Sequence, residues 1–271
     1  MIVDKMEKFD SSKHNRLIVD LPFSYVSTAV YLDFRAYILN LNGEDLVVTQ
    51  DSVYRHDFPC LFLPKNQNNW EFMSASMVSD KDVEKIKNQG IEIAAENSTE
   101  IEYFYATQDF LNPAGKYKQK IKQFEEGYKY KIYNQYDQKK IVEFFNLWES
   151  QKENLNNVFS KESNEIFFFC LENFDKYGIE QIYVEIEGKL VGFVWGVKNS
   201  SDKWISLHSK SDYQYRGLSR FLNYEITKKF ADTKVVSLGT GCQDEGLIQY
   251  KQELGPIEEK KYHYVLTRGK K

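Results

Sequence analysis

The fold is decided by residues 181–222, which read QIYVEIEGKLVGFVWGVKNSSDKWISLHSKSDYQYRGLSRFL. Two apolar runs within this segment, residues 181–186 and 190–197, flank the sequence Glu187-Gly188-Lys189. Apolar runs on either side of a short glycine-containing turn predict a β-hairpin. The next apolar run, from Trp204 to His208, predicts a further strand beside the hairpin.

A glycine-containing loop and a helix follow this strand. Gly217 comes directly before Leu218, Phe221 and Leu222, whose spacing places them on one face of a helix. Hairpin, strand, glycine loop and helix in this order are the element order of the acetyltransferase superfold. The segment therefore indicates a fold of the α/β class.

Strands and helices alternate on both sides of this segment. From residue 128 onward the apolar spacing predicts strand, helix, helix, hairpin, strand, helix, strand, helix and strand. The elements outside the quoted segment are a strand at 130–133, helices around 141–148 and 167–174, a strand at 235–238, a helix at 245–254 and a strand at 262–266. Such alternation predicts α/β layers around a partly parallel sheet.

The first part of the chain holds a second, less regular series of elements. Two apolar runs around Asn42-Gly43 predict a hairpin like the one around Gly188, which indicates an internal duplication. The further elements are strands at 61–63, 91–93 and 103–105 and helices at 80–89 and from Pro113 to Gly127. Residues 1–20 are polar, and we expect them to lie outside the core. We place the two domains at residues 1–125 and 126–271.

The composition is that of a globular protein without unusual charge. The chain has 271 residues, of which 42% are hydrophobic, and a formal net charge of −4. A general attraction for nucleic acid or anionic membranes is therefore not expected. The three cysteines and four histidines are scattered, which argues against a disulfide framework or a metal site. Without a signal peptide or an 18-residue apolar run, the sequence predicts a cytoplasmic protein with no membrane-spanning segment.

Several segments carry a family resemblance. Residues 187–193 and 208–210, the helix start at 217–225, and residues 244–251 resemble the C-terminal catalytic region of the phosphatidylglycerol lysyltransferases. Residues 111–124 resemble the lysine-rich helix that precedes that region, and the last helix also resembles the FemAB peptidoglycan aminoacyltransferases. The resemblance implies two tandem acetyltransferase-like (GNAT) domains, with mixed sheets flanked by helices. It also implies transfer of an aminoacyl group from tRNA to a lipid.

Some residues depart from this family pattern. Ser237 and Gly241 stand where the family usually has Asn and Asp, and Ile248 stands where it has Arg. The resemblance therefore carries over for the fold better than for the substrate. An altered site also leaves open a non-catalytic ligand- or partner-binding protein on a degenerate acetyltransferase fold.

The loop before the helix at 218 is a candidate donor-binding site. Gln214, Arg216, Gly217 and Ser219 lie in a segment that resembles the pyrophosphate loop of acetyltransferases. Unpaired N–H groups and the helix dipole favour an anion at such a helix start. Gly217 permits close approach of a backbone, and Arg216 can pair with a phosphate. The alternative is a plain turn with a helix-capping serine.

The candidate catalytic residues lie in the last helix and at the end of one strand. Lys251 follows Gly246-Leu247 at the family spacing and can steady a phosphate or a developing negative charge; the alternative is a solvated lysine. Asp244 and Glu245 are candidate bases or acceptor anchors, and the alternative is helix capping. His208 is a candidate general base or a structural histidine. Tyr250 can donate a proton to a leaving group or serve only in packing.

A local group of lysines is the candidate nucleic-acid contact. Lys116, Lys118, Lys120 and Lys122 lie on the predicted helix whose apolar residues turn inward. They can follow a tRNA backbone or a nucleotide phosphate, and the alternative is a solvated face.

The sequence thus predicts an acyltransferase that works by direct attack, with no covalent intermediate and no metal. An amine or hydroxyl of a small-molecule or lipid-like acceptor attacks a carbonyl carried by aminoacyl-tRNA or by acyl-CoA. Donors of hydrogen bonds to the developing oxyanion are needed for such a reaction.

Overall fold

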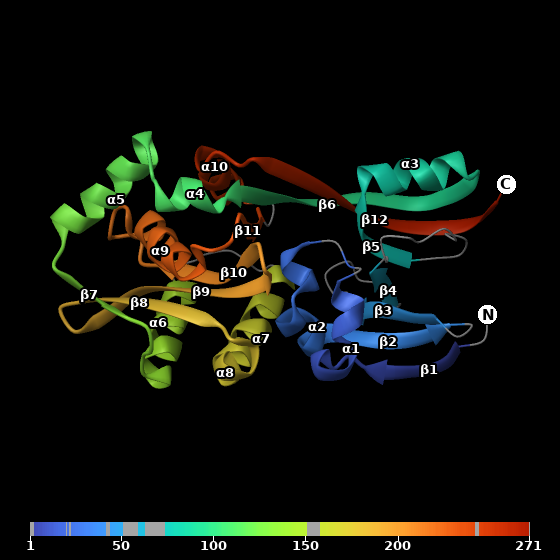
Figure 1. Ribbon diagram of the computed structural model, residues 1–271, viewed down its shortest axis with the longest axis horizontal. Helices are drawn as coiled ribbons and strands as arrows, with labels where there is room; N and C mark the ends of the chain where they lie inside the picture. Colours follow the sequence, from blue (N-terminus) through green and yellow to red (C-terminus); the bar gives the residue numbers. More distant parts are fainter. Residues whose placement is uncertain are drawn as a thin grey trace. The chain divides into compact units, whose positions relative to one another are not determined.

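The chain forms two compact units (Figure 1). The computed structural model describes residues 3–19, 21, 23–41, 44–50, 59–62, 74–150, 158–241 and 244–270. Unit 1 comprises Met1–Tyr103, Thr240–Gln249 and Glu259–Lys271, and unit 2 comprises Phe104–Gly239 and Tyr250–Glu258. This division differs from the predicted domains 1–125 and 126–271, because the chain passes from one unit to the other more than once.

The sheet of unit 2 contains the hairpin that the sequence predicts. Its strands are β7 (Tyr130–Tyr133), β8 (Glu180–Ile186), β9 (Lys189–Ser200), β10 (Lys203–Ser211) and β11 (Val235–Thr240). They lie in the order β11-β10-β9-β8-β7, and the end of β6 from Phe104 onward lies beside β11. Glu187 and Gly188 have φ values of 50° and 79°, as the tight turn of a two-residue hairpin requires.

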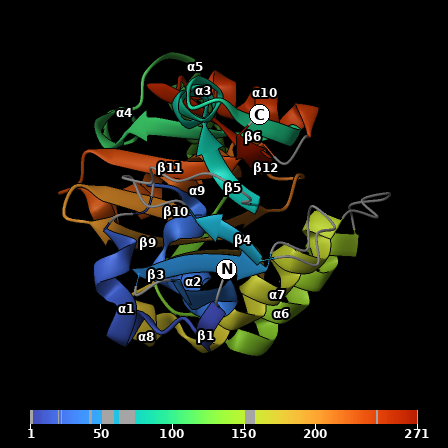
Figure 2. The same cartoon turned by 90° about the vertical axis from the view of Figure 1, so that its right-hand side faces the viewer.

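Helices cover both faces of this sheet. They are α4 (Thr107–Leu111), α5 (Gly115–Gly127), α6 (Gln138–Ser150), α7 (Val158–Glu172), α8 (Phe174–Tyr177), α9 (Leu218–Thr227) and the 3-10 turn η2 (Lys228–Phe230). Phe193 and Trp195 of β9 stack against Phe167 of α7, whereas a Cβ on Gly192 would meet Leu222 of α9. Successive residues of a strand point to opposite faces, so α7 and α9 lie on opposite sides. Helices α6 and α7 lie side by side (Figure 2), with Phe145 stacked on Phe167.

Unit 1 is a second sheet with helices on its faces. Its strands follow the order β1 (Val3–Lys8), β2 (Ala36–Leu41), β3 (Glu44–Gln50), β4 (Pro59–Phe62), β5 (Ser74–Ser79), β12 (Glu258–Lys270) and β6 (Ile91–Ala106). The helices are α1 (Ser11–Ile18), the 3-10 turn η1 (Tyr25–Ser27), α2 (Ala29–Arg35) and α3 (Asp80–Asn88), and α10 (Glu245–Glu253) begins here. The antiparallel pairing of β2 with β3 confirms the predicted hairpin, whose Asn42-Gly43 turn lies outside the described residues.

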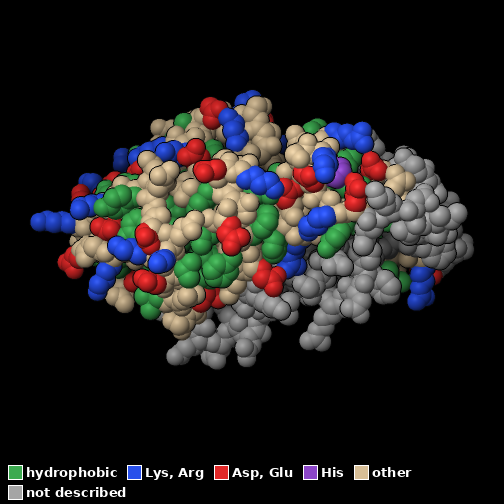
Figure 3. Space-filling view, turned by 90° about the horizontal axis from the view of Figure 1, so that it is seen from below, with side chains coloured by type: hydrophobic (Ala, Val, Ile, Leu, Met, Phe, Trp, Pro, Cys, Tyr) green, Lys and Arg blue, Asp and Glu red, His purple; other side chains and the backbone are tan. Residues whose placement is uncertain are grey.

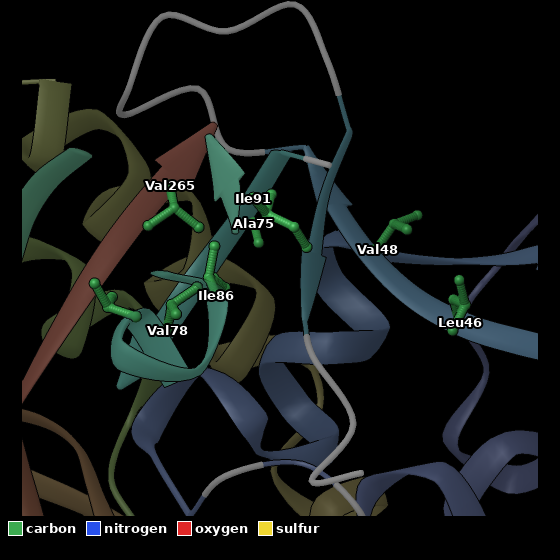
Figure 4. Packing of buried hydrophobic residues seen from close by; sticks show 8 residues of the cluster. Leu46, Val48, Ala75, Val78, Ile86, Ile91 and Val265 are labelled. Carbon is green, nitrogen blue, oxygen red and sulfur yellow. The ribbon is translucent and has the colours of Figure 1, made fainter. Parts of the chain in front are cut away.

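Two apolar clusters form the core of unit 1. One contains Leu46, Val48, Ala75, Val78, Val83, Ile86, Ile91 and Val265, and Figure 4 shows how these side chains pack between α3 and the strands. The other contains Phe9, Leu21, Val26, Leu32, Ala36, Ile38 and Val47. Leu46 and Val48 belong to the first cluster and Val47 to the second, so β3 is buried on both faces.

Parts of unit 1 differ from the sequence-based expectation. Residues 1–20 were expected outside the core, but they form β1 and α1, and Phe9 is only 2% exposed. The segments 91–93 and 103–105 belong to one strand, β6, and the strand predicted at 262–266 extends over 258–270. The polar residues between the apolar segments hid this continuity, since backbone pairing with a neighbouring strand does not depend on apolar side chains.

Gly217 is a contact point between α5 and α9. The two helices lie next to each other in Figure 1. Its φ is +89°, and a Cβ there would lie 2.1 Å from the carbonyl oxygen of Lys120. The two helices also meet through Phe124 and Phe221, whose ring centroids are 4.8 Å apart. On this side of the turn, the backbone that approaches the glycine is therefore that of α5.

This contact predicts an unusual cost for a small substitution. Gly217→Ala should lower the free energy of unfolding by about 2–4 kcal/mol, because it adds left-handed strain and a clash with backbone. Gly188→Ala is the control: its φ is +79° but nothing lies within 4 Å of the added Cβ. The control should lose only about 1–2 kcal/mol. Equal losses in denaturant unfolding of the two variants would contradict the packing role of Gly217.

Candidate active site

The ladder between β10 and β11 ends part-way along both strands. Parallel pairing joins Lys203–Ile205 to Val235–Ser237, and among the described residues no pair follows, although both strands continue. At the same level β10 has a register shift between Ser206 and His208 relative to β9. Such a bulge bends a strand and directs it away from its neighbour. Backbone groups that lose their partner strand at the point of divergence need other hydrogen-bond partners.

Lys251 lies at this point of divergence. It is 5% exposed, and its Nζ donates a hydrogen bond of 2.8 Å to the carbonyl of Leu238, the first β11 residue beyond the paired segment. Its own carbonyl accepts a bond of 2.9 Å from the Tyr105 hydroxyl. The solvated alternative is therefore wrong for this lysine. A buried ammonium is costly to hold unless it has acceptors, so its place is set by the fold.

Tyr250 joins the last helix to the start of α9. Its hydroxyl oxygen accepts hydrogen bonds of 2.9 Å from Ser219 Oγ and 2.9 Å from Asn223 Nδ2. The Arg220 guanidinium lies 4.9 Å from the centre of the Tyr250 ring. Burial raises the pKa of Tyr250, while the Ser219 hydrogen bond and the Arg220 charge oppose this rise. The capping alternative fails for Ser219, because α9 begins after Gly217 without a side-chain cap.

The loop before α9 is held from the side of α5. The carboxylate of Asp212 accepts a bond from the backbone of Gln214, and the Gln214 carbonyl accepts from the Tyr128 hydroxyl at 3.5 Å. The side chains of Gln214 and Arg216 are exposed. Within the described part of the chain, the backbone N–H groups of Ser219 and Arg220 have no hydrogen-bond acceptor. The predicted donor loop thus keeps donors available at its helix start.

Asp244 and Glu245 lie in unit 1, at the start of α10. The Asp244 carboxylate accepts from the backbone N–H of Leu247 at 2.9 Å, so Asp244 caps the helix. Glu245 is exposed in the first turn, where a negative charge suits the helix dipole. These contacts fit the capping alternative for both residues.

The residues that depart from the family pattern are packed. A Cβ at Gly241 would lie 2.5 Å from Cγ1 of Ile248, so these two departures occupy one place in unit 1. Ser237, in unit 2, is fully buried, and its hydroxyl accepts from the backbone of Gly239 at 3.1 Å. The absence of a side chain at Gly241 therefore leaves the space that the larger Ile248 side chain fills.

His208 is buried between aromatic rings. Phe167 and Trp195 lie edge-on to it, with ring centroids 5.8 and 5.5 Å away. Burial, with a smaller effect of the Lys210 charge, lowers the pKa of His208 to about 3. The imidazole is neutral at neutral pH and is a weak base. The geometry favours the structural alternative over the predicted general base.

The burial of His208 predicts a pH effect on stability. Because the pKa in the folded state is below the unfolded value, the unfolded chain binds more protons as the pH falls below about 6.5. This group should cost about 3 kcal/mol between pH 7 and pH 4. Replacing it in His208→Phe should flatten the acid limb of the unfolding free energy measured in urea. An unchanged acid limb would contradict the buried neutral imidazole.

The candidate lysines of α5 differ in their partners. Lys116 pairs with Glu253 at 2.8 Å, and Lys122 pairs with Glu126 at 3.3 Å. Lys120 donates to the uncharged side chain of Gln123, and Lys118 has no carboxylate partner within the described residues. On the face shown in Figure 3, basic and acidic side chains are interspersed. Of the four candidate lysines, Lys118 and Lys120 are therefore the two without a carboxylate partner among the described residues.

Two further features of the described residues bear on the site. No group of three or more His, Cys, Asp or Glu side chains among them is arranged to hold a metal ion. None of the helices in the described segments is long and apolar enough to cross a membrane.

One family profile matches most of the chain. The profile described as "Phosphatidylglycerol lysyltransferase, C-terminal" matches residues 64–269. The chain belongs to this family. No curated protein sequence gives a significant match.

Solved structures show the same fold over nearly the whole chain. A conserved protein of unknown function from Bacteroides thetaiotaomicron matches with a TM-score of 0.76 at 14% identity, covering 98% of this chain and 100% of that one. L-PGS from Bacillus licheniformis matches with a TM-score of 0.62 at 10% identity, covering 95% and 92%. FemX matches with a TM-score of 0.58 at 11% identity, covering 97% of each chain. These likenesses confirm the predicted tandem acetyltransferase-like α/β fold of this phosphatidylglycerol lysyltransferase C-terminal family member.

Proposed function

We propose that this protein is an aminoacyltransferase that moves an aminoacyl group from aminoacyl-tRNA to the amine or hydroxyl of a small-molecule or lipid-like acceptor. Membership of the family makes a transferase the expected class. The observation that carries the proposal is Lys251, a buried ammonium on the Leu238 carbonyl where the β10–β11 ladder ends. A fixed positive charge beside diverging strands is suited to an oxygen that gains negative charge.

The reaction needs no covalent intermediate with the protein. The acceptor nitrogen or oxygen attacks the donor carbonyl, and its new bond to that carbon forms as the bond from the carbon to the tRNA ribose oxygen breaks. The positive charge of the Lys251 ammonium, held at the Leu238 carbonyl, can polarise the donor carbonyl oxygen electrostatically. The leaving oxygen takes the hydroxyl proton of Tyr250. The proton lost by the acceptor passes to water, and solvent reprotonates Tyr250.

A specific observation also favours acyl-CoA as a second candidate donor. The N–H groups of Ser219 and Arg220 at the start of α9, together with the exposed Arg216, suit a pyrophosphate. In that case the bond that breaks joins the carbonyl carbon to sulfur. Lys118 and Lys120 favour aminoacyl-tRNA, because a long polyanion reaches beyond a single helix start.

The proposal is tested by transfer of label. Bulk tRNA charged with radioactive amino acids, and separately radioactive acetyl-CoA, are mixed with the protein and either phosphatidylglycerol vesicles or a panel of small amines. Lys251→Met should reduce transfer about 100-fold or more, as loss of an oxyanion donor does. The control Lys139→Met removes an exposed lysine of α6 and should leave transfer unchanged. Donor binding without turnover would favour the non-catalytic alternative, and no binding of either donor would end the proposal.

The α5 lysines give a separate test of the tRNA donor. Lys118→Glu and Lys120→Glu should raise KM for aminoacyl-tRNA with little change in kcat, because phosphate contacts hold the donor and do not act on the carbonyl. Each lost contact should also reduce the salt slope of binding by about 0.7–0.9. Lys139→Glu is the matched control for net charge. An unchanged salt slope in both α5 variants would remove this lysine pair from the tRNA site.

A further inference from the structure

Asn223 is a polar residue in the buried middle of α9. It is 3% exposed, and its neighbours Phe221 and Leu222 are fully buried. Its Nδ2 donates to the Tyr250 hydroxyl oxygen at 2.9 Å. Its Oδ1 is buried and has no hydrogen-bond partner in the described part of the chain. The amide is thus half satisfied.

Such an arrangement costs stability. A buried polar atom without a partner costs about 1–3 kcal/mol relative to a satisfied one. A leucine at this position would remove the cost and keep nearly the same volume. Within the residues that the structure describes, the polar contact of this side chain is the bond to Tyr250, so the reason for an amide here lies with Tyr250.

The Tyr250 hydroxyl oxygen accepts two hydrogen bonds, and its own proton is not donated to any residue that the structure describes. Ser219 lies one turn before Asn223 on α9, and both side chains donate to the same oxygen. These donors occupy the acceptor positions of the phenol oxygen. Within the described residues no acceptor takes the Tyr250 proton. The proton therefore points away from the α9 side chains that hold the oxygen.

The electrostatic surroundings of this hydroxyl come from several helices. Arg220 of α9 lies over the Tyr250 ring, and Tyr117 of α5 interacts electrostatically with Tyr250. Glu253 of α10 and Lys116 of α5 are connected to Arg220 through ion pairs. Glu253 binds both Arg220 and Lys116 at 2.8 Å, which balances much of their charge. Ser219 and Asn223, the neutral groups that donate to the oxygen itself, are therefore best placed to stabilise a tyrosinate.

We propose that Asn223 is a positioning residue for the transfer reaction: by donating to the Tyr250 oxygen it keeps the phenol proton directed at the leaving group, and it stabilises the tyrosinate once that proton has moved. The inference rests on the proposed function, because it assigns Tyr250 the proton that the leaving oxygen or sulfur takes. Asn223 acts only through Tyr250 and has no contact of its own with the group transferred.

The first test needs no substrate. Protein labelled with carbon-13 at tyrosine Cζ is studied by NMR, and Tyr250→Phe assigns the Tyr250 resonance. In Asn223→Leu the Tyr250 resonance should shift, and its alkaline titration should move up by about one pH unit, since a lost bond to a charged group is worth about 1.5 kcal/mol. Tyr224→Phe, one residue further along α9, is the control and should leave Tyr250 in place. Thermal unfolding of Asn223→Leu should show no loss of stability.

The second test uses turnover. Asn223→Leu should lower kcat about 10-fold with KM unchanged, and the alkaline limb of kcat should move to higher pH, because a general acid is lost as the pH passes its pKa. Asn223→Asp keeps the size, but its ionised form only accepts, so it should capture the phenol proton and lower kcat further. In the double variant with Tyr250→Phe, the Asn223→Leu effect should vanish.

The outcomes separate the two proposals. An unmoved Tyr250 resonance in Asn223→Leu would overturn the positioning role whether or not the protein turns over. Multiplying effects in the double variant would overturn it as well. Absence of transfer in the unaltered protein, with the resonance shifted as expected, would instead count against the proposed function alone.

Discussion

The candidate site depends on the place where hydrogen bonding between β10 and β11 stops. Up to Ile205 and Ser237 the two strands satisfy each other, and beyond that point the Leu238 carbonyl is held by the Lys251 ammonium. A side chain thus replaces a strand as hydrogen-bond partner. This replacement holds the Lys251 amino group in a buried position that a flexible surface lysine would not keep.

The surroundings of that charge are arranged by contacts between helices of unit 2. Helix α5 passes so close to Gly217 that only a glycine fits, and this sets where α9 begins. Helix α9 in turn places Ser219 and Asn223 against Tyr250, the neighbour of Lys251 in α10. The position of these candidate residues is therefore the result of packing some distance from them.

The sequence predicts local elements well and long-range environments poorly. The hairpin at Gly188 and the capping by Asp244 follow from short patterns, and both are present. The burial of Lys251 could not be predicted, because its acceptor comes from another strand. The role of Gly217 depends on α5, about a hundred residues earlier. For Asn223 the sequence contains one usable signal, an amide next to the apolar Phe221 and Leu222, one turn after Ser219.

The last strand has a consequence for how the protein is made. Strand β12 pairs with β5, so the sheet of unit 1 includes residues from near both ends of the chain. Neither unit is one contiguous segment of the chain, so neither can be expressed alone by cutting the gene once. During synthesis, the early strands of unit 1 emerge from the ribosome long before β12. Until β12 emerges, the edge of β5 that pairs with it stays exposed. Unit 1 is completed only after β12 has been synthesised.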